Sequence, residues 1–165
     1  MRLHKGDVLF RQGERGPLFR IQSGLLKVVR VQQDGSPFLF NILLPGEIVP
    51  HHSLLSDKEY HGTAIALMTS DVDVIPPDEW YRSLEENPLM YRDIALQLQM
   101  KLRLTQQRMD QLTASSPADK LALLTDWFRT YVGDYALTEL LTQEEIGQLV
   151  GLRRETVNRL LRKNT

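Results

Sequence analysis

The N-terminal half of the chain is built from short runs in which hydrophobic and polar residues tend to alternate. Alternation with a period of two is typical of half-buried β-strands. Glycine-containing turns separate the runs, and Asp34-Gly35 between two of them is a good signal for a β-hairpin. Many short strands at even spacing indicate a closed barrel or roll rather than a parallel sheet. The predicted strands are Val8–Phe10, Leu18–Ile21, Leu25–Val31, Phe38–Leu44, Thr63–Met68 and Val72–Ile75.

Beyond Pro76-Pro77 the hydrophobic pattern changes to that of helices. Asp78–Glu86 is predicted as a short helix that ends before Asn87-Pro88. The stretch Leu89–Thr113 then carries a seam whose members alternate in steps of three and four residues, which is the pattern of a coiled coil with one polar inner position. The seam residues are Ala95, Leu98, Leu102, Thr105, Met109 and Leu112.

Two arrangements of this long helix fit its pattern. It could pack lengthwise on the β part, or it could pair with its copy in a second chain. The opposite flank is polar, which argues against full burial within one monomer, so we favour the dimer. That flank carries Gln97, Lys101, Arg103, Gln106, Gln107 and Arg108.

Ser115-Ser116-Pro117 marks the start of a further domain. Ser116 is predicted as the N-cap and Pro117 as the first residue of a helix that runs to about Tyr131. A short β-like segment, Tyr135–Leu141, follows it. The apolar face of the helix consists of Leu121, Leu124, Trp127 and Phe128.

The segment Thr142–Lys163 predicts two short helices joined by a tight turn. A capping box of Thr142 and Glu145 starts the first helix. Gly147 inside that helix costs about 1 kcal/mol relative to alanine, so we expect a close crossing by the next helix there. Gly151 falls at the turn, where a positive φ favours glycine. The apolar stripes are Ile146, Leu149 and Val150 in the first helix and Val157, Leu160 and Leu161 in the second.

This pair of helices has the spacing of a helix-turn-helix, whose second helix enters the major groove of DNA. Arginine can bond guanine O6 and N7 there, and glutamate can accept a hydrogen bond from cytosine N4. Arg154, Glu155 and Arg159 lie along one exposed flank and are the predicted base-reading residues. The alternative is an ordinary amphipathic hairpin with a solvated basic face.

Composition and charge agree with site-directed DNA binding. The chain has 165 residues, 42% of them hydrophobic, as in ordinary soluble proteins. Its net charge of −1 argues against a protein that coats nucleic acid, whereas residues 152–165 carry four arginines and one lysine against one glutamate. The absence of cysteine excludes disulfides and cysteine-ligated iron–sulfur clusters. Without a signal peptide or membrane-spanning run, a cytoplasmic protein with no membrane partner is expected.

The order of these segments resembles the Crp/Fnr family of bacterial transcription regulators. The most specific matches are GDVLFRQGE at residues 6–14 and LTQEEIGQLVGLRRETVNRLL at residues 141–161. The resemblance implies an α+β fold with a double-stranded β-roll of the cyclic-nucleotide-binding type as sensor over residues 1–87. A dimerisation helix over 88–114 and a helix-turn-helix DNA-binding domain over 115–165 would follow. The β-hairpin wing that completes this domain in the family has no counterpart in this sequence.

The resemblance also implies partners and DNA contacts. Relatives act as homodimers on double-stranded DNA, with RNA polymerase as a candidate further partner. In members with an Arg-Glu-x-x-x-Arg recognition helix, these residues read a TGTGA-type half-site, and here they are Arg154, Glu155 and Arg159. Contacts with the DNA backbone are assigned to Thr142, Gln143, Arg153, Thr156 and Asn158.

The segment after Pro45-Gly46 departs from the family pattern. Cyclic-nucleotide-binding relatives carry a Gly-Glu pair there, and further on an Arg-Ser or Arg-Thr pair that holds the cyclic phosphate. No arginine lies between Arg30 and Arg82 in this chain, so a cyclic phosphate would lack a bidentate partner and cyclic AMP is not the expected effector. The candidate effector pocket, which covers the positions of both pairs, comprises Pro50, His51, His52, Ser53, Tyr60, His61 and Thr63.

The histidines raise two alternatives. All four, His4, His51, His52 and His61, lie in the β part, so a haem or metal sensor is one alternative. A metal-dependent enzyme of the cupin type is the other, with ligands from His51, His52, His61 and Glu47 or Glu59. Adjacent histidines diverge in both strands and helices, which argues against one shared ion. We therefore expect a regulator without catalytic residues.

Overall fold

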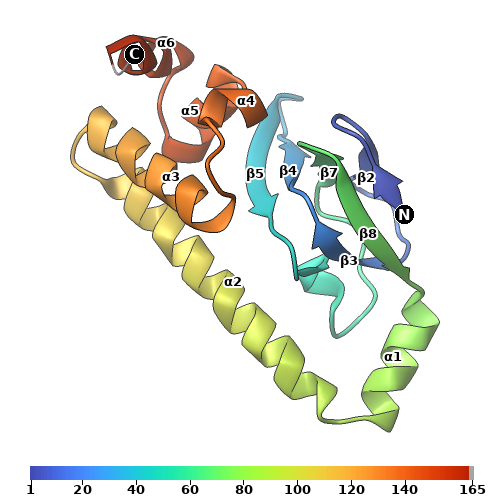
Figure 1. Cartoon of the computed structure of the whole chain (residues 1–165). Coiled ribbons are helices and arrows are strands. Elements are labelled where there is room, and N and C mark those ends of the chain that lie inside the picture. Colours follow the sequence, from blue (N-terminus) through green and yellow to red (C-terminus); the bar gives the residue numbers. More distant parts are fainter. Residues whose placement is uncertain (164–165) are drawn as a thin grey trace. The chain divides into compact units, whose positions relative to one another are not determined.

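The computed structural model describes residues 1–163 and divides the chain into two compact units (Figure 1). The first unit is Met1–Leu102, and the second begins at Arg103. The boundary falls inside one long helix, α2 (Met90–Thr113), whose first half belongs to the first unit and whose last turns belong to the second.

The first unit is a β-roll of two antiparallel four-stranded sheets. Their strand orders are β1-β8-β3-β6 and β2-β7-β4-β5. The six strands predicted from alternation are confirmed to within two residues at their ends. The bounds are β1 Arg2–Leu3, β2 Val8–Phe10, β3 Leu18–Ser23, β4 Leu26–Val31, β5 Pro37–Leu43, β6 Ile48–Val49, β7 Thr63–Ala66 and β8 Ser70–Ile75.

Local turn chemistry and long-range pairing both contribute to this unit. The predicted β4–β5 hairpin is present, with Gly35 at a φ of 82° in its turn and Val31 opposite Pro37. The side chain of Asp34 also accepts a hydrogen bond from the Ser36 backbone N–H, at 2.9 Å. β3 instead pairs with β8, far along the sequence, which closes the roll.

The apolar side chains of both sheets form one core. It consists of Leu3, Phe10, Phe19, Ile21, Leu26, Leu43, Val49, Tyr60, Ala64, Ala66 and Val72. A second cluster joins the roll to α1 (Pro77–Glu86) and to the start of α2. Trp80 belongs to this cluster, and its indole N–H donates to the Leu54 carbonyl at 2.8 Å. The roll and these helices therefore support each other.

The polar flank of α2 is only partly covered, since Arg103 and Gln106 are exposed whereas Gln97 lies against the short strand β6. The Gln97 Oε1 accepts from the Ile48 N–H at 3.0 Å and its Nε2 donates to the Ile48 carbonyl at 2.9 Å. This part of the flank thus satisfies backbone groups at a strand edge, which an apolar side chain could not do.

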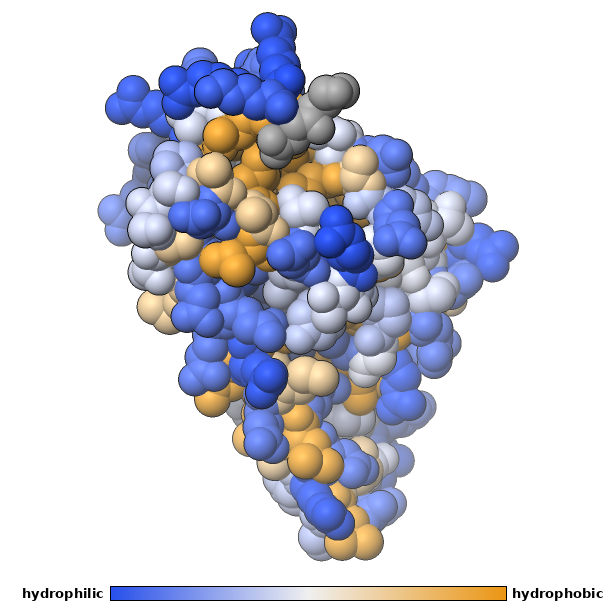
Figure 2. Space-filling view, turned by 60° about the vertical axis from the view of Figure 1, so that its left-hand side comes forward, coloured by the Kyte–Doolittle hydropathy of each residue, from blue (hydrophilic) through white to orange (hydrophobic). Residues whose placement is uncertain are grey.

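The predicted seam of α2 lies largely in solvent. Leu102 and Met109 are each 60% exposed, and Leu98 is half-buried against the second cluster of the first unit. Figure 2 shows apolar side chains in orange among hydrophilic ones along the lower part of this face, over α2. The protomer thus leaves an apolar stripe of the helix uncovered.

The second unit is helical. α3 (Pro117–Tyr131) begins as predicted, with the Ser116 hydroxyl accepting from the Asp119 N–H at 3.1 Å, and it buries its four predicted apolar residues. The predicted β-like segment is wrong, because Leu137–Leu140 forms the short helix α4. Leu137 and Leu140, three residues apart, are both buried and lie on one face of this helical turn. The remaining helices are α5 (Gln143–Val150) and α6 (Arg154–Lys163).

Across residues 1–163, the helices include none with the length and apolar character of a membrane-spanning segment.

Candidate DNA-binding interface and sensor cluster

The start of α5 is fixed by the predicted capping box. The Thr142 hydroxyl accepts from the Glu145 N–H at 3.2 Å, and Glu145 Oε2 accepts from the Thr142 N–H at 2.9 Å. Two backbone donors that the helix leaves without partners are therefore satisfied, and the entry of the chain into α5 is defined. Gln143 follows as the first residue of α5 and is half-buried.

Two glycines shape the turn between α5 and α6. Gly151 has φ 66° and ψ 40°, the left-handed conformation that the sequence predicted. A Cβ on Gly147 would lie 2.4 Å from the Leu152 carbonyl oxygen, so only glycine fits. The close approach at Gly147 is confirmed, but it comes from the turn itself and not from the next helix, because the turn folds back directly over α5.

α6 buries one face and presents the other to solvent. Val157 is fully buried, and Leu160 and Leu161 are half-buried beside it. Thr156 and Asn158 are half-buried at the border of the exposed face. The side chains that are exposed on α6 and just before it are Arg153, Arg154, Glu155, Arg159, Arg162 and Lys163.

The arginines of this face are available for a partner. None of Arg153, Arg154 and Arg159 forms an ion pair with a carboxylate of residues 1–163. Glu155 and Arg159, both predicted to read bases, line a shallow hollow of about 440 Å³ on α6 together with Asn158, Arg162 and Lys163. The positive charge of this face suits a polyanion. Its arginine and glutamate side chains suit the hydrogen-bonding base edges in the major groove of DNA.

The candidate effector residues lie around a buried ion pair in the first unit. Glu47, in the turn before β6, is 9% exposed and accepts hydrogen bonds from the Leu44 N–H at 2.9 Å and from Lys101 Nζ at 3.0 and 3.2 Å. Lys101 comes from α2 and also donates to the Ile42 carbonyl at 3.1 Å. His51 Nε2 lies 2.8 Å from Glu47 Oε2.

The two adjacent histidines point to different partners, as expected from their adjacency. His51 lies beside Glu47, whereas the His52 ring stacks on His61 with a centroid separation of 3.9 Å. His52 Nε2 also lies 2.9 Å from the Glu59 carbonyl oxygen. Burial lowers the pKa of His52 and His61 adds to this effect, while the contact with Glu59 opposes it.

Other members of the candidate pocket serve the β-roll. Tyr60 packs on Phe10 in the core, with ring centroids 4.4 Å apart, and its hydroxyl donates to the Pro17 carbonyl at 2.7 Å. Burial raises the pKa of Tyr60 to about 12, so the hydroxyl keeps the proton it donates. The Thr63 hydroxyl accepts from the Gln12 N–H at 3.1 Å. Pro50 and Ser53 flank the two histidines in a short 3₁₀ turn, His51–Ser53.

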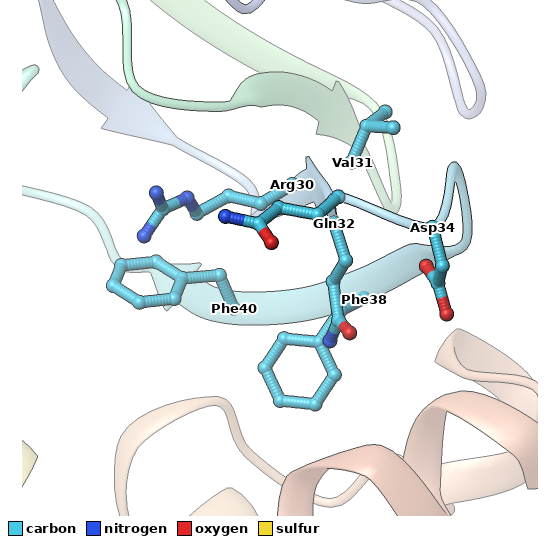
Figure 3. Close-up of a pocket in the computed structure, with 7 residues that line it drawn as sticks. Arg30, Val31, Gln32, Asp34, Phe38 and Phe40 are labelled. Atoms are coloured by element: carbon cyan, nitrogen blue, oxygen red, sulfur yellow. The ribbon is translucent and has the colours of Figure 1, made fainter.

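A surface hollow of the first unit lies elsewhere. It measures about 690 Å³ and is formed by β4, β5 and the hairpin between them (Figure 3). The Arg30 guanidinium lies over the Phe40 ring, 5.1 Å from its centroid, and Val31 and Phe38 add apolar surface. None of the candidate effector residues lines this hollow.

The arrangement of a β-roll, a long helix and a helix-turn-helix matches known families. Residues 1–87 match the family described as cyclic nucleotide-binding domain, and residues 140–163 match the family described as bacterial regulatory proteins, crp family. The chain belongs to the Crp/Fnr family of transcriptional regulators.

Similar proteins cover nearly the whole chain. A CRP-like cAMP-activated global transcriptional regulator of Mycobacterium tuberculosis is 30% identical over 95% of this chain and 73% of its own length. The transcriptional activator protein anr of Pseudomonas aeruginosa is 30% identical over 96% of this chain and 67% of its own length. The structure of a CRP-family transcriptional regulator from Thermus thermophilus superposes with a TM-score of 0.81 at 21% identity, over 99% of this chain and 83% of the other.

Membership in the Crp/Fnr family assigns this chain to DNA-binding transcriptional regulators and not to enzymes. Among residues 1–163, no group of three or more histidine, aspartate or glutamate side chains is placed to hold a metal ion. Haem binding stays an untested alternative for the sensor unit.

The sequence did not reveal the buried ion pair of Glu47 and Lys101 beside the candidate effector residues. Lys101 lies on the polar flank of α2 and Glu47 was noted only as a possible metal ligand. The sequence does offer a weak signal for this ion pair. Lys101 lies on the polar flank of a long helix, and Glu47 follows the Pro45-Gly46 turn of the β-roll. The pairing itself, over 54 residues, left no local signature.

The buried carboxylate gives this Crp/Fnr chain a testable pH dependence. Burial alone would raise the pKa of Glu47, but His51, Lys101 and the Leu44 N–H more than offset it, so the pKa lies below its ordinary value of 4.5. A carboxyl group whose pKa is lower in the folded state than in the unfolded state stabilises the fold at pH values above its unfolded-state pKa. This stabilisation is lost as the pH falls through the folded-state pKa. Urea unfolding between about pH 7 and pH 3 should therefore show a loss of stability that begins near pH 5.

Glu47→Gln is the variant that isolates this contribution. It should lower stability at neutral pH by about 1–3 kcal/mol, because Lys101 keeps a buried charge without its partner. It should also flatten the pH dependence, whereas Asp73→Asn, at an exposed carboxylate of the same roll, should preserve it. An unchanged pH slope in Glu47→Gln would contradict this assignment.

Proposed function

We propose that this chain acts as a homodimeric regulator that reads a TGTGA-like half-site in each half of a palindromic operator. Arg154, Glu155 and Arg159 are the proposed base-reading residues. The observation that carries the proposal is that all three are exposed on one face of α6, while Val157 anchors the opposite face. Arginine and glutamate on such a face match the hydrogen-bonding groups of G·C pairs in the major groove.

The residues around these three provide the proposed contacts with phosphate. Arg153 is exposed beside Arg154, and Thr156 and Asn158 border the same face. Thr142 and Gln143 lie at the N-terminus of α5, where the helix dipole favours a phosphate. Contacts of this kind set register and affinity but carry little sequence information.

The second copy is proposed to bind through the seam of α2. An exposed row that includes Leu102 and Met109 is costly for a monomer, and a matching row on a second chain would cover it. Two recognition helices presented by such a dimer would meet half-sites about 34–36 Å apart, one turn of DNA. The proposed division of labour is sensing by residues 1–87, dimerisation by 88–114 and DNA binding by 115–165. RNA polymerase stays a predicted further partner.

The proposed effector is not cyclic AMP. Cyclic AMP carries a phosphate, and the candidate pocket offers no arginine for it. The buried cation of this region, Lys101, is already paired with Glu47. The relative from Mycobacterium tuberculosis is named for activation by cyclic AMP, so this chain would differ from it in the ligand that it senses.

Thermal unfolding with added cyclic AMP tests this part of the proposal. A ligand at about 100 times its Kd stabilises the folded state by about 2.7 kcal/mol, which would raise the melting temperature clearly. We expect no shift with cyclic AMP at millimolar concentration. A saturable increase in melting temperature would show that the pocket still binds the nucleotide.

Selection of bound fragments from random DNA tests the proposed reading of the operator. The purified protein should enrich a palindrome with TGTGA-like half-sites, and a fragment with a single half-site should bind more weakly. Sedimentation of the free protein should give a dimer. Enrichment without a shared sequence, or a monomer that binds single half-sites as tightly as palindromes, would contradict the proposal.

A further inference from the structure

The C-terminal end of α5 has a carbonyl that the helix cannot satisfy by itself. The last four carbonyls of an α-helix have no intrahelical donor. That of Gly147 accepts from the backbone N–H groups of Gly151 and Leu152. The carbonyl of Leu149 accepts instead from Arg108 Nη2, at 3.4 Å. Arg108 comes from the last turns of α2, so a side chain of the long helix completes the helix-turn-helix.

A second side chain of α2 lies near the turn itself. Leu112 Cδ2 is 3.4 Å from the position that a Cβ on Gly151 would take. Arg108 and Leu112 are one helical turn apart and therefore share a face of α2. We call these two residues the α2 clasp. Arg108 bonds the last turn of α5, and Leu112 lies beside the glycine that leads into α6.

The clasp lies directly beside the predicted dimer seam. Met109, next to Arg108 in sequence, is a seam residue and is 60% exposed. Leu112 belongs to both sets, because it is the last predicted seam residue and also lies beside Gly151. In a dimer formed through this seam, the C-terminal ends of the two α2 helices would therefore lie side by side. Each would hold the turn that precedes the recognition helix of its own chain.

We infer that Arg108 is a positioning residue for DNA reading, which fixes the helix-turn-helix to the end of the dimerisation helix and so sets the spacing of half-sites that the dimer accepts. This inference rests on the proposed dimer. Arg108 does not need to touch DNA for this role, since it acts through the Leu149 carbonyl.

Arginine suits this position for physical reasons. Its guanidinium donates several directional hydrogen bonds, whereas an apolar contact would permit sliding along the helix. A cation near the C-terminus of α5 also interacts favourably with the helix dipole. Burial lowers the pKa of Arg108, yet an arginine keeps its charge in proteins, so the contact persists over the physiological pH range.

The test compares Arg108→Met with two other variants of the full chain. Methionine keeps most of the apolar volume but removes the donors, whereas Arg108→Lys keeps a cation and should restore part of the function. Arg103→Met is the matched control, because Arg103 is an exposed arginine on the same helix and in the same compact unit. Binding is measured at one salt concentration on the selected palindrome, on palindromes with shorter and longer spacers, and on a single half-site.

Arg108→Met should lose about tenfold in affinity for the best-spaced palindrome and should discriminate less between spacers, with little change on a single half-site. Arg103→Met should behave like the original chain on all DNAs. Hydrogen exchange gives a readout that needs neither DNA nor a dimer. The Leu152 amide, which donates to the Gly147 carbonyl at 2.9 Å, should exchange faster in Arg108→Met.

The outcomes separate the inference from the function on which it rests. Faster exchange with an unchanged spacer preference would make Arg108 merely structural and would overturn the inference, as would no change in either measurement. If the original chain itself showed no preference for palindromes, the proposed function would fail and the inference with it, while hydrogen exchange would still report whether the clasp holds the turn.

Discussion

Arg154→Ala should reduce affinity for the selected operator by about 5- to 150-fold, which corresponds to about 1–3 kcal/mol. The guanidinium of Arg154 is exposed and unpaired with any carboxylate of residues 1–163, so its removal leaves the protein fold intact. The variant should lose the proposed bidentate contact with guanine, and the preference at one G·C pair should relax accordingly. Titration of the variant against operators substituted at each position measures both effects.

Arg153→Ala is the matched control, since it removes the same charge from the neighbouring residue. Arg153 precedes α6 and is proposed to contact phosphate. Its loss should weaken binding to all sequences alike and should reduce the salt dependence of binding by about one counterion. If both variants lost as much affinity for random DNA as for the operator, the assignment of base reading to Arg154 would be wrong.

The helix-turn-helix could be predicted in detail because its signals are local. The capping box of Thr142 and Glu145 and the left-handed Gly151 both act within a few residues of sequence, and both are present in the structure. The same holds for the Asp34-Gly35 hairpin. At these positions the residue that identifies the conformation also stabilises it, so sequence and structure agree.

Very short strands that depend on distant partners could not be predicted. Strands β1 and β6 have two residues each and exist only because β8 and β3 provide their pairing. Arg2 and Asp71 strengthen the first pairing with a bidentate ion pair across 69 residues. The misassigned segment before α5 shows the same limit, because its apolar spacing fits a strand or a turn of helix, and packing in the second unit decides between them.

The candidate site divides in the same way. The proposed base-reading residues are exposed on one helix face, so helical periodicity alone placed them together. The sensor cluster depends on Lys101 reaching a carboxylate in a turn of the roll, and the polarity that suggested an exposed flank of α2 is what makes this contact. A polar helix face therefore predicts exposure to solvent only where the surface packed against that face holds no buried polar group.

The same helix offers the second large effect, because its uncovered seam can be disrupted without disturbing the protomer. Leu102 is 60% exposed in the protomer, so Leu102→Asp removes little intramolecular packing. In a dimer it would place two carboxylates at the centre of an apolar interface, where both the desolvation of charge and their repulsion are unfavourable. We expect a monomer by sedimentation at concentrations where the original chain is dimeric.

Loss of the dimer should remove the gain from binding both half-sites at once, which is about 10²- to 10⁴-fold on a palindrome. Affinity for a single half-site should change little, because α6 is intact. Leu96→Asp is the matched control, since Leu96 is 54% exposed on the same helix but lies outside the seam. A monomer produced by Leu96→Asp and not by Leu102→Asp would move the interface to another face of α2 and would overturn the assignment of the seam.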